Sequence, residues 1–178
     1  MDDPRGLAEA YHNLALAHMK CKQWKYAGQY FSHSLTYSQK LNNLHLVGIT
    51  YYHQAELAVE MSEFDVAKGY CKKCLQYFKR IGNREGLADG YKLMGMINRL
   101  LNDLDTACSY LEQSLALNRE IKNRLNEAET LREMGLLYRV KKDAARAEDL
   151  LSQAHKLFKE IGSPSDITLT EALMKQAA

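Results

Sequence analysis

One series of alanines in this 178-residue chain recurs with an unbroken 40-residue period, at Ala27, Ala67, Ala107 and Ala147. A second series of small residues keeps the same period, at Ala15, Ala55, Gly95 and Gly135. A fixed period of this length is typical of one supersecondary unit stacked repeatedly, in which each unit buries its apolar face against its neighbours. The period therefore constrains the chain to a repeat architecture.

Within each 40-residue unit the apolar residues follow helical spacing. In the first unit Tyr11, Leu14 and His18 are three or four residues apart, and a second such run starts at Ala27. The sequence predicts two helices per unit and no strand. The expected helices span residues 6–20, 24–41, 46–60, 64–81, 86–101, 104–121, 125–140 and 144–161.

Short turns separate the expected helices. Inside the units, helix-capping residue types occupy the turn at Ser62, Asn102, Asp103 and Asp143. Between the units, glycine or asparagine can take the left-handed conformation that ends a helix, as at Gly82 and Gly162. The small residues of the two periodic series leave room for two helix backbones to pack closely.

The composition narrows the functional classes. The 24 basic and 22 acidic residues give a net charge of only +2, without the concentrated basic face of a nucleic-acid binder. No run approaches the roughly 18 apolar residues of a membrane span, and residues 1–6 lack the layout of a signal peptide. The four cysteines show no dense spacing and agree with free thiols. We therefore expect a cytoplasmic protein that has neither a nucleic-acid nor a membrane partner.

Three dipeptides carry a resemblance to a known family: Leu14-Ala15, Met94-Gly95 and Met134-Gly135, each followed by the next alanine of the first series. They resemble the motif of the tetratricopeptide repeat, a helix-turn-helix unit. The usual unit has about 34 residues, and the longer period here resembles LGN and Pins polarity adaptors, kinesin light chains and bacterial Rap and PlcR-type peptide receptors. The segment 81–88 is typical of that subclass. The resemblance implies an all-α, right-handed superhelical solenoid of four repeats with a concave groove.

We expect a single domain over residues 1–178, with a short C-terminal capping helix at 166–177 after four repeats. The repeats are expected at approximately 5–43, 44–83, 84–123 and 124–163. Residues 3–8 match the inter-unit segment 83–88, which predicts that the chain is an excerpt or the end of a longer protein. An uncapped first helix would expose apolar surface, so self-association through the N-terminal repeat is also expected.

The resemblance implies a non-catalytic scaffold or adaptor that binds a protein or peptide in the concave groove. An alternative that it also allows is the sensor domain of a peptide-responsive bacterial regulator. Asn13 stands in a phrase similar to the Asn-Leu-Gly of such repeats, whose amide bonds the backbone of the ligand, and Tyr52 is the expected central anchor. First-helix positions carried over from the family give the candidate groove residues: Asn13, Leu16, Met19, Tyr52, His53, Val59, Lys92, Met96, Arg99, Arg132 and Arg139.

Simpler interpretations of some candidates stay open. Lys92 can pair with Asp89, and Arg132 with Glu129, as ordinary helix pairs three residues apart on a solvated face. Tyr52 can merely pack against the neighbouring first helix.

Catalytic or metal chemistry is not expected. Cys71 and Cys74 form a C-x-x-C pair, but no second pair exists to complete a zinc site, so we interpret them as core thiols. Cys108 is expected to point outward. His12 and His53 can face one another across adjacent first helices, yet they lack a third metal ligand. We expect no cofactor, no metal and no enzymatic activity.

Overall fold

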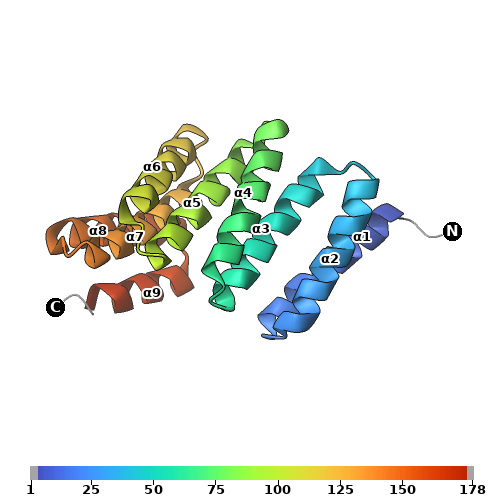
Figure 1. Ribbon diagram of the computed structural model, residues 1–178. Helices are drawn as coiled ribbons and strands as arrows, with labels where there is room; N and C mark the ends of the chain where they lie inside the picture. Colours follow the sequence, from blue (N-terminus) through green and yellow to red (C-terminus); the bar gives the residue numbers. More distant parts are fainter. Residues whose placement is uncertain (1–3, 176–178) are drawn as a thin grey trace. The chain divides into compact units, whose positions relative to one another are not determined.

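The structure is a computed structural model that describes residues 4–175 (Figure 1). These residues form nine helices and no strand. This arrangement confirms the all-α repeat fold expected from the sequence. Within the described residues, no helix combines the length and the apolar composition that crossing a bilayer requires. In chain order the helices are α1 (Pro4–Lys20), α2 (Trp24–Lys40), α3 (Leu44–Glu60), α4 (Phe64–Arg80), α5 (Arg84–Leu100), α6 (Leu104–Glu120), α7 (Arg124–Val140), α8 (Ala144–Ile161) and α9 (Pro164–Lys175).

The turns from α1 to α8 are three residues long and share one backbone geometry. Their middle residues have positive φ and recur at a constant interval, at Lys22, Asn42, Ser62, Gly82, Asn102, Lys122 and Lys142. In the α2–α3 turn, Asn42 N donates to Gln39 O at 3.0 Å, and Asn43 N donates to Ser38 O at 2.9 Å. These two bonds form the Schellman motif, which satisfies the last carbonyl groups of a helix.

The left-handed conformation also occurs in turns where the sequence does not predict it. It was expected for glycine or asparagine between units, but Lys22 and Ser62 adopt it inside units. Ser62 and Asn102 therefore end a helix and do not cap the next one, whereas Asp103 is an N-cap as expected. A side chain at positive φ is strained, and the two backbone hydrogen bonds of each turn offset that strain.

The third residue of most of these turns caps the helix that follows. Asn43 Oδ1 accepts a hydrogen bond from Leu46 N at 3.1 Å. The same bond is made at Asn83, Asp103, Asn123 and Asp143. One turn therefore ends a helix and starts the next within three residues, which keeps every helix in the same register.

On a larger scale than the 40-residue repeats, the chain divides into two compact parts, which we call unit 1 and unit 2. The boundary between them falls after Gly90, inside α5. Unit 1 holds α1 to α4 and the start of α5. In unit 1, α1 packs against α2, and α3 packs against both α2 and α4. A buried cluster forms its core: Ala15, Ala27, Phe31 and Leu57.

Unit 2 holds the rest of α5 and helices α6 to α9. Its α7 packs against α6 and α8, and α9 packs against α8 (Figure 1). One buried cluster consists of Ala107, Leu111, Met134 and Leu137. A second consists of Ala128, Leu131, Ala154 and Phe158.

Helix α9 takes the position of a further first helix in unit 2. Pro164 stands one repeat period after Arg124, the first residue of α7, and Thr170 is buried as Thr130 is. Ile167 packs against the cluster around Phe158. The capping helix expected at 166–177 thus begins earlier, at Pro164, and residues 176 and 177 lie outside the described part of the chain.

Two glycines of the small-residue series allow a close helix crossing. A Cβ placed on Gly95 would lie 2.5 Å from Leu111 Cγ and 3.3 Å from the carbonyl oxygen of Ala107. A Cβ on Gly135 would lie 2.7 Å from Leu151 Cγ. The leucine of the second helix therefore occupies the space that a side chain on the first helix would need.

We expect Gly95→Ala to lower the free energy of unfolding by about 1 to 3 kcal/mol, because buried Leu111 must move to admit the methyl group. The matched control is Gly69→Ala in α4, where a Cβ would meet nothing within 4 Å. That substitution should raise the free energy of unfolding by about 0.5 to 1 kcal/mol through helix propensity. Urea unfolding measures both, and a change of the same sign in the two variants would contradict the close crossing.

Candidate functional site

The first-helix residues of unit 1 line two pockets. The apolar pocket, of about 460 Å³, lies between α1 and α3. Its Leu16, Met19 and Trp24 also pack against the core cluster around Ala15, which anchors the pocket wall. The residues lining the apolar pocket are Leu16, Met19, Lys20, Lys22, Trp24, His53, Glu56 and Glu60.

The acidic pocket, of about 260 Å³, lies between α3 and the start of α5. Glu85 and Asp89 supply its carboxylates. A Cβ on Gly86 would lie 2.8 Å from the ring of Phe78, so glycine permits the close approach of α5 to that ring. The residues lining the acidic pocket are His45, Ile49, Tyr52, His53, Phe78, Asn83, Glu85, Gly86 and Asp89.

His53 belongs to both pockets and lies in an aromatic cluster. Its ring stacks on Phe31 with an interplanar angle of 9° and meets Tyr52 edge-on, with ring centroids 5.2 Å apart. His53 Nδ1 lies 2.8 Å from Glu56 Oε2. Rings held on several sides lose little further rotamer freedom when a ligand binds, so this wall is preorganised.

His12 is the buried neighbour of this cluster. Its ring centroid lies 5.2 Å from that of His53, as their spacing of close to one repeat period suggested. The Thr50 hydroxyl donates to Leu46 O at 2.7 Å and accepts from His12 Nδ1 at 3.0 Å. Burial, together with the adjacent His53, lowers the pKa of His12 to about 4.

In unit 2 the predicted groove cations bond residues of the next first helix. Arg99 Nη2 bonds Glu133 Oε2 at 3.0 Å. Lys92 Nζ bonds Asn126 Oδ1 at 3.2 Å and also bonds Glu129 Oε2. We call these contacts, together with those of Arg132 and Arg139 below, the ionic ladder.

The ionic ladder continues from α7 to α9. Arg132 Nη1 bonds Asp166 Oδ1 at 2.6 Å, and Arg139 Nη2 donates to the carbonyl oxygen of Leu173. Burial by itself raises the pKa of Asp166, but hydrogen bonds from Arg132 and Ser163 outweigh burial and hold that pKa below its usual value. The simpler interpretation, in which Arg132 pairs with Glu129, is therefore wrong, because Arg132 bonds Asp166 of α9 and Glu129 bonds Lys92.

The structure places the predicted groove residues in three groups. Leu16, Met19, Tyr52 and His53 line the two pockets. Asn13 is exposed, Val59 and Met96 are half-buried, and none of the three lines either pocket. The four cations, Lys92, Arg99, Arg132 and Arg139, belong to the ionic ladder.

The pocket residues outside the predicted groove set include two aromatic ones, Trp24 and Phe78. The resemblance assigned the groove to first helices, whereas both of these residues stand on second helices. Trp24 is the only tryptophan of the chain and directly follows a turn, which is the one signal that could have found it.

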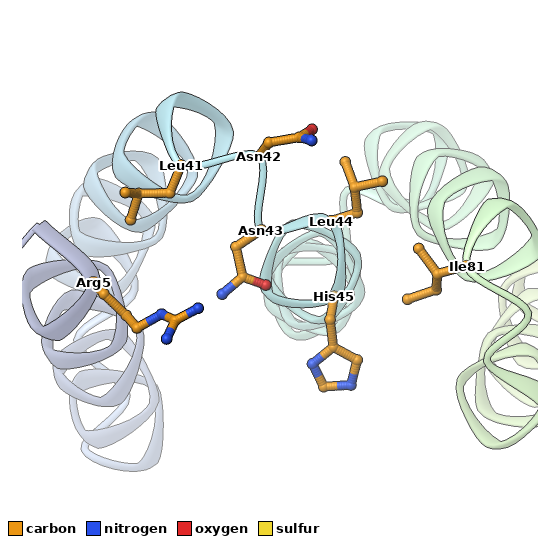
Figure 2. Close-up of a pocket in the computed structure, with 7 residues that line it drawn as sticks. All are labelled: Arg5, Leu41, Asn42, Asn43, Leu44, His45 and Ile81. Carbon is orange, nitrogen blue, oxygen red and sulfur yellow. The ribbon is translucent and has the colours of Figure 1, made fainter.

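A third pocket, of about 570 Å³, surrounds the α2–α3 turn (Figure 2). Figure 2 shows Arg5 of α1 on one side of the turn and Ile81, after α4, on the other. Its remaining residues are Leu41, Asn42, Asn43, Leu44 and His45. Since Asn43 Oδ1 already caps α3, the polar side chain at the centre of this pocket serves the turn.

The cysteines and histidines assemble no metal site among residues 4–175. Cys71 and Cys74 are fully buried, and Cys71 Sγ donates to Gly90 O at 3.3 Å, which agrees with core thiols. Cys108 is half-buried, with its sulfur 3.8 Å from the Tyr138 hydroxyl, so it is less exposed than expected. Burial raises the pKa of the Cys108 thiol, which disfavours a reactive thiolate.

Helical hairpins that recur with a fixed period and pack through small residues define a helical-hairpin repeat protein. The chain belongs to the tetratricopeptide repeat family, whose model matches residues 46–120 and 86–160. These matches together cover more than half of the chain. No curated protein gives a significant match.

Solved structures share the fold at low sequence identity. A STAND signal-transduction ATPase with a tetratricopeptide repeat sensor from Pyrococcus horikoshii matches with a TM-score of 0.84 and 19% identity, over 99% of this chain and 28% of that one. The repeats of a putative kinesin light chain from Podosopora anserina match with a TM-score of 0.75 and 14% identity, over 99% of this chain and 87% of that one. A Rap protein complexed with Competence and Sporulation Factor matches with a TM-score of 0.69 and 14% identity, over 97% of this chain and 54% of that one. The chain thus spans about half of the Rap protein and less than a third of the ATPase.

We expect Asp166→Asn to lower the free energy of unfolding by about 1 to 3 kcal/mol, because Arg132, whose side chain is only 14% exposed, then lacks its carboxylate. The matched control is Asp105→Asn, since Asp105 pairs with Lys141 but its side chain is 99% exposed. The control should not measurably change stability. Urea unfolding and hydrogen exchange in α9 measure the two variants, and equal losses would argue against a structural ladder.

A pH dependence follows from His12. Because the pKa of folded His12 is about 4 and the unfolded value is about 6.5, the unfolded chain binds more protons between these values. The stability from neutral His12 is complete above pH 6.5 and is lost as the pH falls towards 4. Unfolding at pH 7 and pH 5 should differ by about 2 kcal/mol more in the wild type than in His12→Gln. The same pH slope in both proteins would remove His12 as the cause.

Proposed function

We propose that the chain is a non-catalytic protein- or peptide-binding scaffold that binds its partner at the apolar and acidic pockets of unit 1. One observation carries the proposal: where Arg99 and Glu133 form an ion pair in unit 2, the corresponding positions of unit 1 line a pocket. Corresponding residues of the two units are separated by a whole number of repeat periods, so the residues of unit 1 can be compared directly with those of unit 2.

The apolar pocket illustrates the contrast. Arg99 and Glu133 form a mostly buried ion pair in unit 2. Their counterparts two periods earlier, Met19 and His53, line the apolar pocket. An ion pair between adjacent first helices is thus replaced by an apolar side chain, an imidazole and a pocket of about 460 Å³.

The lining of the apolar pocket suits a protein ligand. Leu16, Met19 and Trp24 offer adaptable apolar contact, and tryptophan is enriched at binding hot spots. Charged residues stand at the rim, where they favour specificity over affinity. Lys20 and Glu60 are exposed examples. The four ladder cations then serve to hold α7 and α9, and the ligand contacts come from unit 1.

Peptides selected by phage display against the whole chain test the proposal. We expect Tyr52→Ala and Met19→Ala each to weaken binding of the selected peptides by about 2 kcal/mol, roughly 30-fold. Tyr52→Ala should do so with little change in melting temperature, whereas Met19 also packs against the core cluster. The control is Val66→Ala, at an exposed apolar residue of α4 that lines neither pocket. If Tyr52→Ala lowers stability and leaves affinity unchanged, Tyr52 only packs and the binding site lies elsewhere.

A peptide-responsive sensor domain is the alternative function. It is supported by the likeness to a Rap protein that is complexed with Competence and Sporulation Factor, and to an aspartyl phosphate phosphatase of Bacillus subtilis at 17% identity. The two functions differ in the ligand. A sensor binds a short free peptide as tightly as the same sequence within a folded protein, whereas a scaffold prefers the protein.

Self-association through the N-terminal repeat belongs to the same proposal. Leu14 is 43% exposed, whereas its counterparts Gln54, Met94 and Met134 are 6%, 0% and 7% exposed. The position is buried in three repeats, whereas in the first repeat it holds an exposed apolar residue. This exposed leucine favours contact with a second copy. We expect Leu14→Gln, which places the residue type of position 54 there, to shift the chain towards monomer in sedimentation equilibrium. A monomeric wild type at high concentration would exclude this contact.

A further inference from the structure

Helix α4 of unit 1 carries a row of cations on its solvent side. Seven residues separate Lys72 from Lys79, and seven separate Lys73 from Arg80. Seven residues are nearly two helical turns, so these side chains share one side of α4. Two further exposed residues stand among them. We call the six exposed residues the basic face: Gly69, Lys72, Lys73, Gln76, Lys79 and Arg80.

The fold itself does not require these cations. The positions that correspond to the basic face are exposed in α2, α6 and α8 as well. There they hold one cation in α2, one cation and two carboxylates in α6, and two cations and two carboxylates in α8. The same helix position is thus built three times without a concentration of positive charge.

The cations of the basic face are not neutralised within the fold. Residues 69–80 contain no acidic residue. Within the described chain, none of the four cations forms an ion pair. Lys73 is held by cation–π contacts, with its Nζ 5.1 Å from the ring centroid of Tyr51 and 5.7 Å from that of Tyr70. The net charge of only +2 therefore conceals a local surface that complements a negatively charged partner.

Gly69 is the one residue of the basic face without a side chain. A Cβ on Gly69 would meet nothing within 4 Å, so packing within the chain does not demand glycine. The corresponding residues of the other second helices are Gln29, Ser109 and Asp149. Glycine inside a helix costs about 1 kcal/mol relative to alanine. Its effect on the outer side is to let another backbone come close to α4.

We propose that the basic face binds an acidic α-helix of a partner protein. Carboxylates seven residues apart on such a helix are separated by about 10 Å. The two cation pairs of the basic face have the same separation, because they too stand on an α-helix. Gly69 permits a close helix crossing, since the distance between packed helices depends on the side chains at the contact. The inference goes beyond the proposed function, because none of these residues lines the apolar or the acidic pocket.

A single-stranded nucleic acid is the other ligand with regularly spaced negative charge. Proteins that bind single strands combine cations with aromatic rings on which the bases stack. Beside the basic face, however, the ring of Tyr51 stacks on those of Tyr70 and Tyr77, with centroids 6.2 and 5.8 Å apart. The tyrosine rings thus stack on one another within the fold, which favours a ligand held by charge and close backbone contact.

The probe for this inference is a fluorescently labelled helical peptide of about 20 residues, a length that supports an isolated helix. It consists of alanine and glutamine with glutamates at seven-residue spacing, and a control peptide of the same composition spreads its glutamates around the helix. Each is titrated into the whole chain at low ionic strength and followed by fluorescence anisotropy. We expect a Kd on the order of 0.1 to 1 mM for the first peptide and several-fold weaker binding of the control. Salt at about 0.15 M should weaken both.

Two double variants change the charge of the chain equally. Lys72→Gln with Lys79→Gln should weaken binding of the first peptide about tenfold. The control is Lys156→Gln with Lys159→Gln, at two exposed cations on the corresponding side of α8, and should leave the affinity unchanged. All four residues are exposed, so both variants should keep the melting temperature of the wild type.

Gly69→Gln tests the close approach without changing the charge. Glutamine is the residue type at position 29, and it favours a helix more than glycine does. The variant should therefore melt at a higher temperature than the wild type and still bind the first peptide several-fold more weakly. Higher stability with weaker binding excludes misfolding as the cause. An unchanged affinity would overturn the close helix crossing.

Three other results overturn the inference. The first is the absence of saturable binding. The second is equal affinity for the two peptides, or an equal loss in the α8 control, which would leave only non-specific charge attraction. The third is tighter binding of a single-stranded thymidine oligonucleotide of the same charge. The proposed function fails separately, because Tyr52→Ala removes binding at the pockets and leaves the basic face intact.

Discussion

The three-residue turn between helices is the constraint on which the rest of this structure depends. In it, one residue takes a left-handed conformation and two backbone hydrogen bonds end the helix. The third residue, such as Asn43 or Asp143, then caps the next helix. Because the turn has no freedom in length, successive helices start at a constant interval and successive hairpins at twice that interval. Corresponding side chains therefore reach the same position in every hairpin, and the residue type at each position decides the outcome.

That shared register lets one fold present two kinds of surface. In unit 2 this position of the repeat is Arg99, which bonds Glu133 and closes the space between adjacent first helices. Where the corresponding residue is Met19, the space is the apolar pocket. Closing contacts stabilise unit 2, whereas unit 1 keeps pockets and exposes Leu14. Under the proposed function, stability and binding depend on different residues of the same repeated framework.

Much of the fold could be predicted from the sequence, because helix period, small residues and turn residues are local or strictly periodic signals. Gly95 indicated a close crossing, and the structure places Leu111 against it. The candidate site was predictable only in part. Arg132 reaches Asp166 on another helix, and no periodic signal distinguishes that partner from Glu129, which lies one turn away on the same helix. Trp24 was missed because its helix was not the one expected to line the groove.

By itself the sequence determined the helical hairpins, their periodic register and the burial of the small residues, since these follow from backbone hydrogen bonding and from the volume available at a helix crossing. Only the tertiary structure decided which charged residues form ion pairs within the fold and which positions line pockets. That choice depends on the reach of side chains between helices that are distant in sequence. Arg132 meets Phe158 and Asp166 in one place, whereas Tyr52 and Phe78 line a pocket at the corresponding place.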